Sequence, residues 1–223
     1  MNELIVMSFF GISFGSIYFL YKYFQKEGLY FYLVISTIFL IISSVKLGPF
    51  LGFDININIP IFTGILATFY ILLEKEKKHL KEIFTYVSFI SLLTAIILII
   101  LSLYVPSITS SYNYAFKDAF LNNYRSLFMS SICLISNVYL ITKIYPKIKK
   151  EFESYFISIA LISITLGLVN SFIFAFTCYL GVLDISLIIK LVFSNYIISL
   201  LFSSLYIPVI LLINKIKKVK KNA

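Results

Sequence analysis

Three asparagine side chains stand inside long apolar stretches of the chain, at Asn137, Asn170 and Asn195. A side-chain amide carries donor and acceptor groups that all need partners away from water. Polar groups at membrane depth usually face the interior of a helical bundle or a water-filled cavity. Hydrogen bonding between helices, about 0.6–2 kcal/mol per pair, is the simpler explanation for any one of them. Three on successive stretches favour a shared polar cavity that binds a solute, with Tyr196 beside Asn195 as a stacking face.

A second group of candidate site residues lies in the segment 52–73, whose two halves follow different periods. Residues 54–59 alternate polar and apolar, as an extended segment with one wet face does. Residues 60–73 are apolar throughout and predict a helix with Pro60 in its first turn. Such a helix is shorter than the roughly 20 residues of a membrane crossing, which makes this a short, broken span. We therefore expect Asn56 and Asn58 to line a solute cavity, with a plain surface loop as the alternative.

Other kinds of site have little support in the sequence. The cysteines Cys133 and Cys178 lie inside apolar stretches and lack the spacing of a metal site. The single histidine, His79, stands in a lysine-rich loop, and the sequence has no phosphate-binding loop of the P-loop type. No nucleophile with a neighbouring base, and no pair of carboxylates, falls at membrane depth. We therefore expect no catalytic residues, no metal and no cofactor, and no enzymatic activity.

The elements that position these amides are predicted to be membrane helices. Hydrophobic residues make up 60% of the chain and charged residues 13%, whereas soluble domains have about 25% charged residues. The composition predicts an all-α, polytopic helical membrane bundle, with residues 1–223 as a single transporter domain. The apolar runs predict about seven spans, at 4–24, 29–47, 56–73, 83–105, 126–145, 155–180 and 185–213.

Lysines predict how the spans are oriented. They cluster at every second junction: Lys22 and Lys26; Lys75, Lys77, Lys78 and Lys81; Lys143, Lys147, Lys149 and Lys150; Lys215, Lys217, Lys218, Lys220 and Lys221. Short lysine-rich loops stay in the cytoplasm, so we expect the amino terminus outside and the carboxyl terminus inside the cytoplasmic (inner) membrane of a bacterium. The net charge of +9 then reflects topology and contact with anionic membrane lipids, and not nucleic-acid binding.

The order of these features resembles the queuosine-precursor transporter family, also called the vitamin uptake transporter (VUT) family. The resemblance extends over nearly the whole chain as a pattern: Met1-Asn2-Glu3-Leu4, Gly28-Leu29-Tyr30, Lys46, Gly52 with the broken segment, Leu66-Ala67-Thr68, Lys77-Lys78, Pro106-Ser107, Leu134-Ile135-Ser136, Gly181-Val182, Tyr196 and Pro208. It implies a helical importer of a deazaguanine precursor of the tRNA nucleoside queuosine. A small, deazapurine-like molecule is the implied partner, and the implied role is in supplying tRNA modification.

The chain departs from that family where the family carries ionisable residues. Asn137 and Asn170 stand where the family has aspartate, and Ser199 stands where it has a membrane lysine. Uncharged site residues suit a neutral ligand, so we favour a small, flat, polar heterocycle. Two alternatives stay open: a substrate-binding membrane subunit that works with separate ATPase partners, and a degenerate membrane scaffold that transports nothing. Homo-oligomer formation is also left open.

Overall fold

The computed structural model describes residues 2–75, 80–104, 117–121 and 123–215, and 88% of them are helical. The elements are α1 (Asn2–Ser43), β1 (Leu47–Phe50), β2 (Phe53–Asn56), α2 (Ile59–Lys75), α3 (Leu80–Tyr104), the π-helix η2 (Lys117–Leu121), α5 (Tyr124–Phe152), α6 (Tyr155–Tyr179) and α7 (Ile185–Lys215). Within this part of the chain, five helices are long and apolar enough to cross a membrane. The predicted all-α membrane bundle is confirmed.

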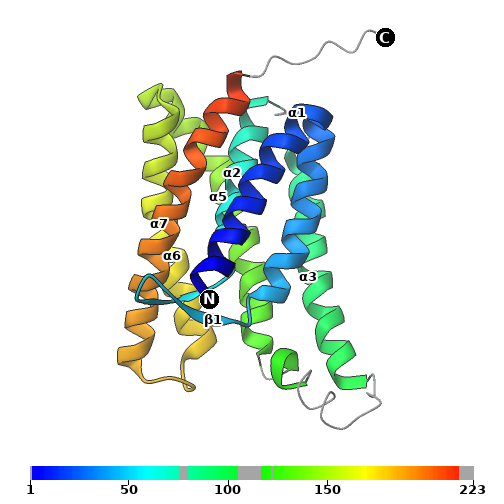
Figure 1. Ribbon diagram of the computed structural model, residues 1–223, viewed down its shortest axis with the longest axis vertical. Coiled ribbons are helices and arrows are strands. Elements are labelled where there is room, and N and C mark those ends of the chain that lie inside the picture. The colour runs from blue at the N-terminus through cyan, green and yellow to red at the C-terminus, as the bar shows by residue number, and fades with distance from the viewer. Residues whose placement is uncertain (1, 76–79, 105–116, 122, 216–223) are drawn as a thin grey trace.

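Helix α1 consists of two antiparallel limbs joined by a sharp break (Figure 1). The break lies at Gln25, whose φ of 53° and ψ of −131° are not helical. Gly28 lets the limbs approach each other, because a Cβ there would lie 2.3 Å from the Leu20 carbonyl oxygen. The limbs correspond to the first two predicted spans, although the second ends at Ser43 and not at residue 47. With α2, α3, α5, α6 and α7 they give seven long helical segments among the described residues.

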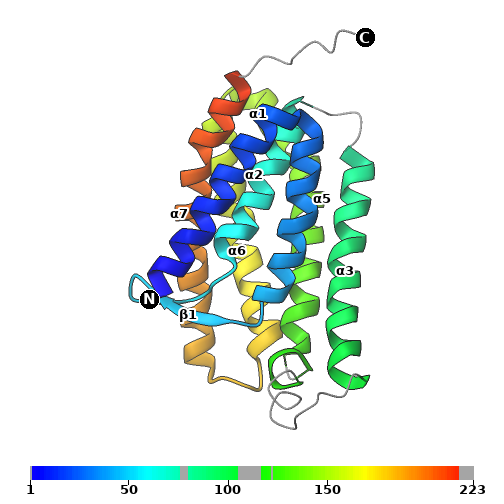
Figure 2. The same cartoon turned by 45° about the vertical axis from the view of Figure 1, so that its right-hand side comes forward.

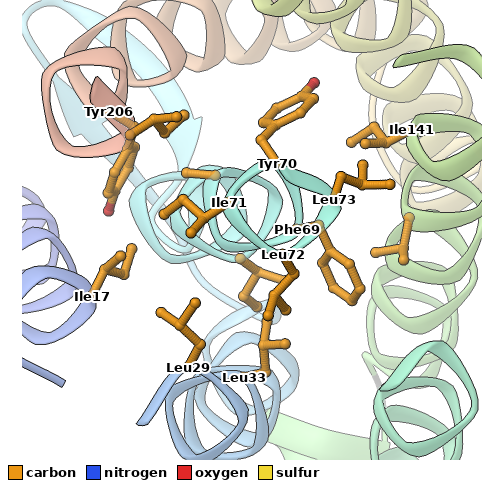
Figure 3. Packing of buried hydrophobic residues seen from close by; sticks show 14 of the residues in the cluster. Ile17, Leu29, Leu33, Phe69, Tyr70, Ile71, Leu72, Leu73, Ile141 and Tyr206 are labelled. Atoms are coloured by element: carbon orange, nitrogen blue, oxygen red, sulfur yellow. The ribbon is translucent and has the colours of Figure 1, made fainter. Parts of the chain in front are cut away.

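The short helix α2 occupies the centre of the bundle. Of its 17 residues, 13 are buried, as expected for a helix that is apolar on every face. Figure 3 shows its side chains enclosed by residues from α1, α5 and α7: Ile17, Leu29, Leu33, Ile141 and Tyr206. The helix begins at Ile59, so Pro60 lies in its first turn as the sequence predicted. The surrounding helices carry the exposed apolar side chains that would face lipid.

A β-hairpin precedes α2 and supplies the extended part of the broken span. β1 and β2 pair antiparallel, with Leu47 opposite Asn56. The turn between them uses Leu51 (φ 50°) and Gly52 (φ 79°), the two positive φ values that a tight hairpin requires. The hairpin lies against α7 and α1 within the height of the bundle (Figures 1 and 2). The extended segment predicted for 54–59 is therefore shorter than expected, because the strand ends at Asn56 and a turn leads into α2.

The two ends of the bundle differ in charge. The described lysines of the four clusters lie where α1 reverses and where α2, α5 and α7 end, the upper end in Figure 1. The hairpin and the α6–α7 turn lie toward the opposite end. Lys77, Lys78, His79, Pro106 and Ser107 lie outside the described residues, as do the lysines after residue 215.

Three hydroxyl groups converge on Gly64 of α2. Ser13 and Tyr32, from the two limbs of α1, are hydrogen-bonded to each other through their hydroxyls. The Tyr206 hydroxyl of α7 donates to the Pro60 carbonyl oxygen at 2.9 Å. A Cβ at Gly64 would lie 2.3, 2.5 and 2.9 Å from the hydroxyl oxygens of Ser13, Tyr32 and Tyr206. Glycine therefore lets α1 and α7 pack directly on the central helix.

We expect Gly64→Ala to lower the free energy of unfolding by about 1–3 kcal/mol, because the added methyl overpacks this contact. Thermal melting of the purified protein in detergent measures the change. The matched control is Gly11→Ala in α1, where an added Cβ meets no atom within 4 Å. Equal melting temperatures for the two variants would contradict the prediction, because they would show that the three hydroxyl groups move aside for the added methyl at no cost in stability.

Candidate functional site

A polar cavity lies between α2, α5, α6 and α7, next to the segment that joins β2 to α2. Its volume is about 70 Å³. The polar residues that line it are Asn56, Asn58, Thr63, Tyr70, Ser130, Asn137, Ser163, Asn170, Ser171, Asn195, Ser199 and Ser203. Among the described residues, none of the side chains that line it is acidic, basic or histidine. The cavity therefore carries polar groups on a largely apolar wall, and its described lining has no formal charge.

All five asparagines singled out in the sequence line this cavity: Asn56, Asn58, Asn137, Asn170 and Asn195. They come from four separate parts of the chain, which the fold brings together. Whether they bind a solute stays a prediction.

Tyr196 does not line the cavity. Its ring packs behind Gly167, where an added Cβ would lie 3.6 Å from the ring atoms. The reason is helical geometry, since neighbouring residues point about 100° apart and Asn195 is the one that faces inward. The aromatic residues on the cavity wall are Phe62, Tyr70 and Phe174, which the sequence analysis did not identify. The sequence could not single these three out, because aromatic residues are abundant along the whole chain.

Asn137 and Asn170 join α5 to α6 across the cavity wall. Asn137 Nδ2 donates to Asn170 Oδ1 at 3.0 Å and to the Cys133 carbonyl oxygen at 2.7 Å. The hydrogen bond between Asn137 and Asn170 is therefore an interhelical contact of the kind that was the simpler explanation for these residues. Yet Asn137 Oδ1 and Asn170 Nδ2 have no hydrogen-bond partner in the described part of the chain. One acceptor and one amino group remain for a molecule in the cavity.

Asn195 and Asn56 hold the extended segment in place. Asn195 Oδ1 accepts a hydrogen bond from the Asn56 backbone N–H at 2.9 Å. Asn56 Nδ2 donates to the Ser44 carbonyl oxygen at 3.1 Å, and its Oδ1 accepts from the Asn58 backbone N–H at 3.4 Å. Asn56 thus uses both ends of its amide on the fold. The Asn195 amino group has no partner within the described residues.

The cavity volume limits what can occupy it as it stands. About 10–15 Å³ suffices for one water molecule, so 70 Å³ has room for several. Pockets that enclose organic ligands measure about 300–1,000 Å³. A heterocyclic solute would therefore require the walls to move apart, and Phe62, Leu66 and Tyr70 are among the large side chains that line them.

A smaller cavity of about 10 Å³ continues toward the lysine-rich end. It shares Thr63, Leu66, Tyr70, Ser163 and Ser203 with the main cavity and reaches Ile210 near the end of α7. The two cavities mark a path between α2, α6 and α7.

An ion pair lies beyond each side of the polar cavity. Toward the lysine-rich end, Lys149 Nζ lies 2.5 Å from Glu74 Oε1, which also accepts from the Tyr145 hydroxyl at 2.9 Å. Toward the hairpin, Lys190 Nζ lies 3.3 Å from Asp54 Oδ2. Sequence reasoning missed both pairs, because their partners lie 136 and 75 residues apart in the chain and no local spacing connects them.

Cysteine labelling tests the geometry of the cavity. In a chain with Cys133→Ser and Cys178→Ser, we expect Asn58→Cys to react with a small polar thiol reagent and Ile55→Cys to react slowly. Asn58 lines the cavity, whereas Ile55 is fully buried in an apolar cluster. The rates are compared by mass spectrometry of folded protein. Equal rates at both positions would place the segment on an open surface.

Comparisons of the chain with protein-family models, with curated proteins and with solved structures gave no match.

Proposed function

We propose that the chain is a membrane importer of a small, flat, uncharged, polar heterocycle, with a deazaguanine-type queuosine precursor as the favoured ligand. The observation that carries the proposal is the cavity inside the bundle, whose described lining is uncharged and where amide groups of Asn137, Asn170 and Asn195 have no partner among the described residues. The resemblance to the queuosine-precursor transporter family supports the choice of ligand. The apolar membrane helices are what such a transporter requires.

The cavity offers complementary groups to the edge of a heterocycle. Asn137 Oδ1 can accept a hydrogen bond from a ring N–H, while the neighbouring Asn170 amino group can donate to a ring carbonyl. The rings of Phe62, Tyr70 and Phe174 offer apolar surfaces for the ring face. A charged solute would find no opposite charge among the described lining residues and would lose its hydration.

Movement through the bundle requires the cavity to open first at one end and then at the other. The Asp54–Lys190 pair ties the hairpin to α7 on one side, and the Glu74–Lys149 pair ties α2 to α5 on the other. In this proposal each pair separates when the cavity opens on its side. The narrow path past Tyr70, Ser163 and Ser203 then leads to the lysine-rich end.

We expect Asn137→Ala and Asn170→Ala each to weaken ligand binding about ten- to a hundredfold. A polar edge of the bound ring would be left unpaired, which costs about 1–3 kcal/mol. Binding and uptake of a deazaguanine are measured in proteoliposomes at matched amounts of folded protein. The control is Ser136→Ala, because Ser136 is exposed, bonds to the Ile132 carbonyl oxygen of its own helix and does not line the cavity.

The same experiment separates the alternatives. Unchanged affinity in both asparagine variants would remove these residues from the site. Binding without uptake by the isolated protein, with uptake restored by co-purifying ATPase subunits, would favour the substrate-binding subunit. Neither binding nor uptake across deazapurines, purines and water-soluble vitamins would favour the scaffold.

The lysine-rich end of the bundle predicts a topology for the proposed importer. A reporter that is active only in the cytoplasm, fused after Ala223, is expected to give a signal. The reason is that lysine-rich ends of membrane helices stay on the cytoplasmic side, and the described end of α7 lies at the lysine-rich end of the bundle. A reporter fused before residue 1 gives the complementary signal and serves as the control. Activity of the carboxyl-terminal fusion on the outer face would contradict the proposed orientation.

A further inference from the structure

A second hollow lies on the hairpin side of the polar cavity, between the β-hairpin and the early turns of α7. It is a groove of about 280 Å³, and most of its residues are exposed. Its side chains are apolar apart from one ion pair, and its lining consists of Leu47, Gly48, Pro49, Asp54, Leu183, Leu187, Lys190 and Leu191. No described residue lines both the groove and the cavity. The hairpin lies beside α7 in both views (Figures 1 and 2).

The groove and the cavity are lined by the same faces of the same two elements. Side chains alternate along a strand, so Asp54 and Asn56 of β2 lie on one face, about 7 Å apart, and Ile55 lies on the other. Residues four apart in a helix also share a face, so Leu191 and Asn195 of α7 are aligned about 6 Å apart. In each element the first residue of the pair lines the groove and the second lines the cavity. The groove therefore leads toward the cavity.

A buried hydrogen bond crosses the boundary between the two hollows. The Asn56 backbone N–H donates to Asn195 Oδ1 at 2.9 Å, and both residues are buried. Asn195 is the first of the α7 residues that line the cavity, so it stands next to the groove. The Asp54–Lys190 pair lies farther out and is the weaker contact, because both side chains are more than half exposed and water competes for them.

The opposite face of the hairpin is held to α7 by apolar contacts. Phe50 and Ile55 belong to one buried cluster with Ile198 and Phe202, and the ring centroids of Phe50 and Phe202 lie 5.9 Å apart. Breaking the hydrogen bond at the boundary removes no member of that cluster. The hairpin would therefore stay packed on α7 while its polar edge separates.

We propose that this groove is the entrance to the polar cavity from the hairpin side, and that the hydrogen bond between Asn56 and Asn195 is the latch that closes it. The latch needs no solute, whereas use of the entrance by a small polar solute rests on the proposed function. A neutral polar heterocycle that enters here first meets the Asp54 carboxylate, which accepts hydrogen bonds, and the Lys190 ammonium, which donates them.

Labelling of the native Cys133 measures access to the cavity without any solute. Cys133 lines the cavity, and Cys178→Ser leaves it as the only cysteine of the chain. A small polar thiol reagent is added to the folded protein in detergent, and the rate is followed by mass spectrometry. We expect Asn195→Leu to raise the rate about tenfold, roughly the effect of losing one buried hydrogen bond. Asn195→Asp keeps an oxygen that accepts from the Asn56 N–H, and we expect it to raise the rate only slightly.

A bulky side chain in the groove tests the route. We expect Leu187→Trp to slow the labelling of Cys133 severalfold, both in the Asn195→Leu chain and in the chain that keeps Asn195. The matched control is Val169→Trp, in a separate, apolar groove between α6 and α7, which leaves the rate unchanged. Leu187 and Val169 are 45% and 49% exposed, so the fold can accommodate either tryptophan. Labelling that Leu187→Trp does not slow would place the entrance elsewhere, and equal rates for Asn195→Leu and Asn195→Asp would overturn the latch.

Uptake of a deazaguanine by proteoliposomes separates this proposal from the proposed function. We expect Leu187→Trp to slow uptake, and uptake by this variant at the full rate would overturn the entrance. If the labelling rates follow the latch and the groove but no variant binds or takes up a deazaguanine, the choice of solute fails and the entrance stands.

Discussion

The structure depends on how the backbone is paired where helices are interrupted inside the bundle. Between Ser43 and Ile59 the chain is not helical, and away from water each of its N–H and C=O groups needs a partner. The β-hairpin pairs the facing N–H and C=O groups of its two strands, and its exposed residues can meet water. At its end the Asn56 N–H is left, and the side chain of Asn195 accepts from it at 2.9 Å. This contact fixes the start of α2 against α7.

The same interruption creates the cavity. Because α2 begins only at Ile59, no long side chains from a preceding helical turn fill the space between α5, α6 and α7. Amides that would be costly in a dry core can stand there, since they meet one another or water. Asn56 uses its amide in hydrogen bonds that hold the fold, whereas Asn137, Asn170 and Asn195 each keep one amide group that has no partner among the described residues. Polar groups left free in an otherwise well-packed bundle are expected at functional sites.

Much of this architecture could be predicted from the sequence, and the part that could not has physical causes. The apolar runs predicted the bundle, and the alternation before Pro60 predicted the broken span. The partner strand β1 was missed, because Leu47–Phe50 is only four residues long and contains Gly48 and Pro49, which predict a turn. The sequence could not show that Asn195 faces the cavity and Tyr196 does not, because α7 is apolar on all sides. The two ion pairs depend on contacts between distant segments, which no local pattern records.

The two ion pairs are unequal in exposure, and under the proposed transport function this bears on which side of the cavity would open more easily. Residues 54–74 form one continuous wall, tied at one end to α7 and at the other to α5. The side chains of Lys190 and Asp54 are 58% and 52% exposed, so water competes for them and the pair contributes only about 0–1 kcal/mol. Lys149 and Glu74 are 26% and 13% exposed, and Glu74 also accepts the Tyr145 hydroxyl. Separating that pair would remove better-shielded contacts, so under the proposed transport function it opposes opening more strongly than the exposed pair at the hairpin does.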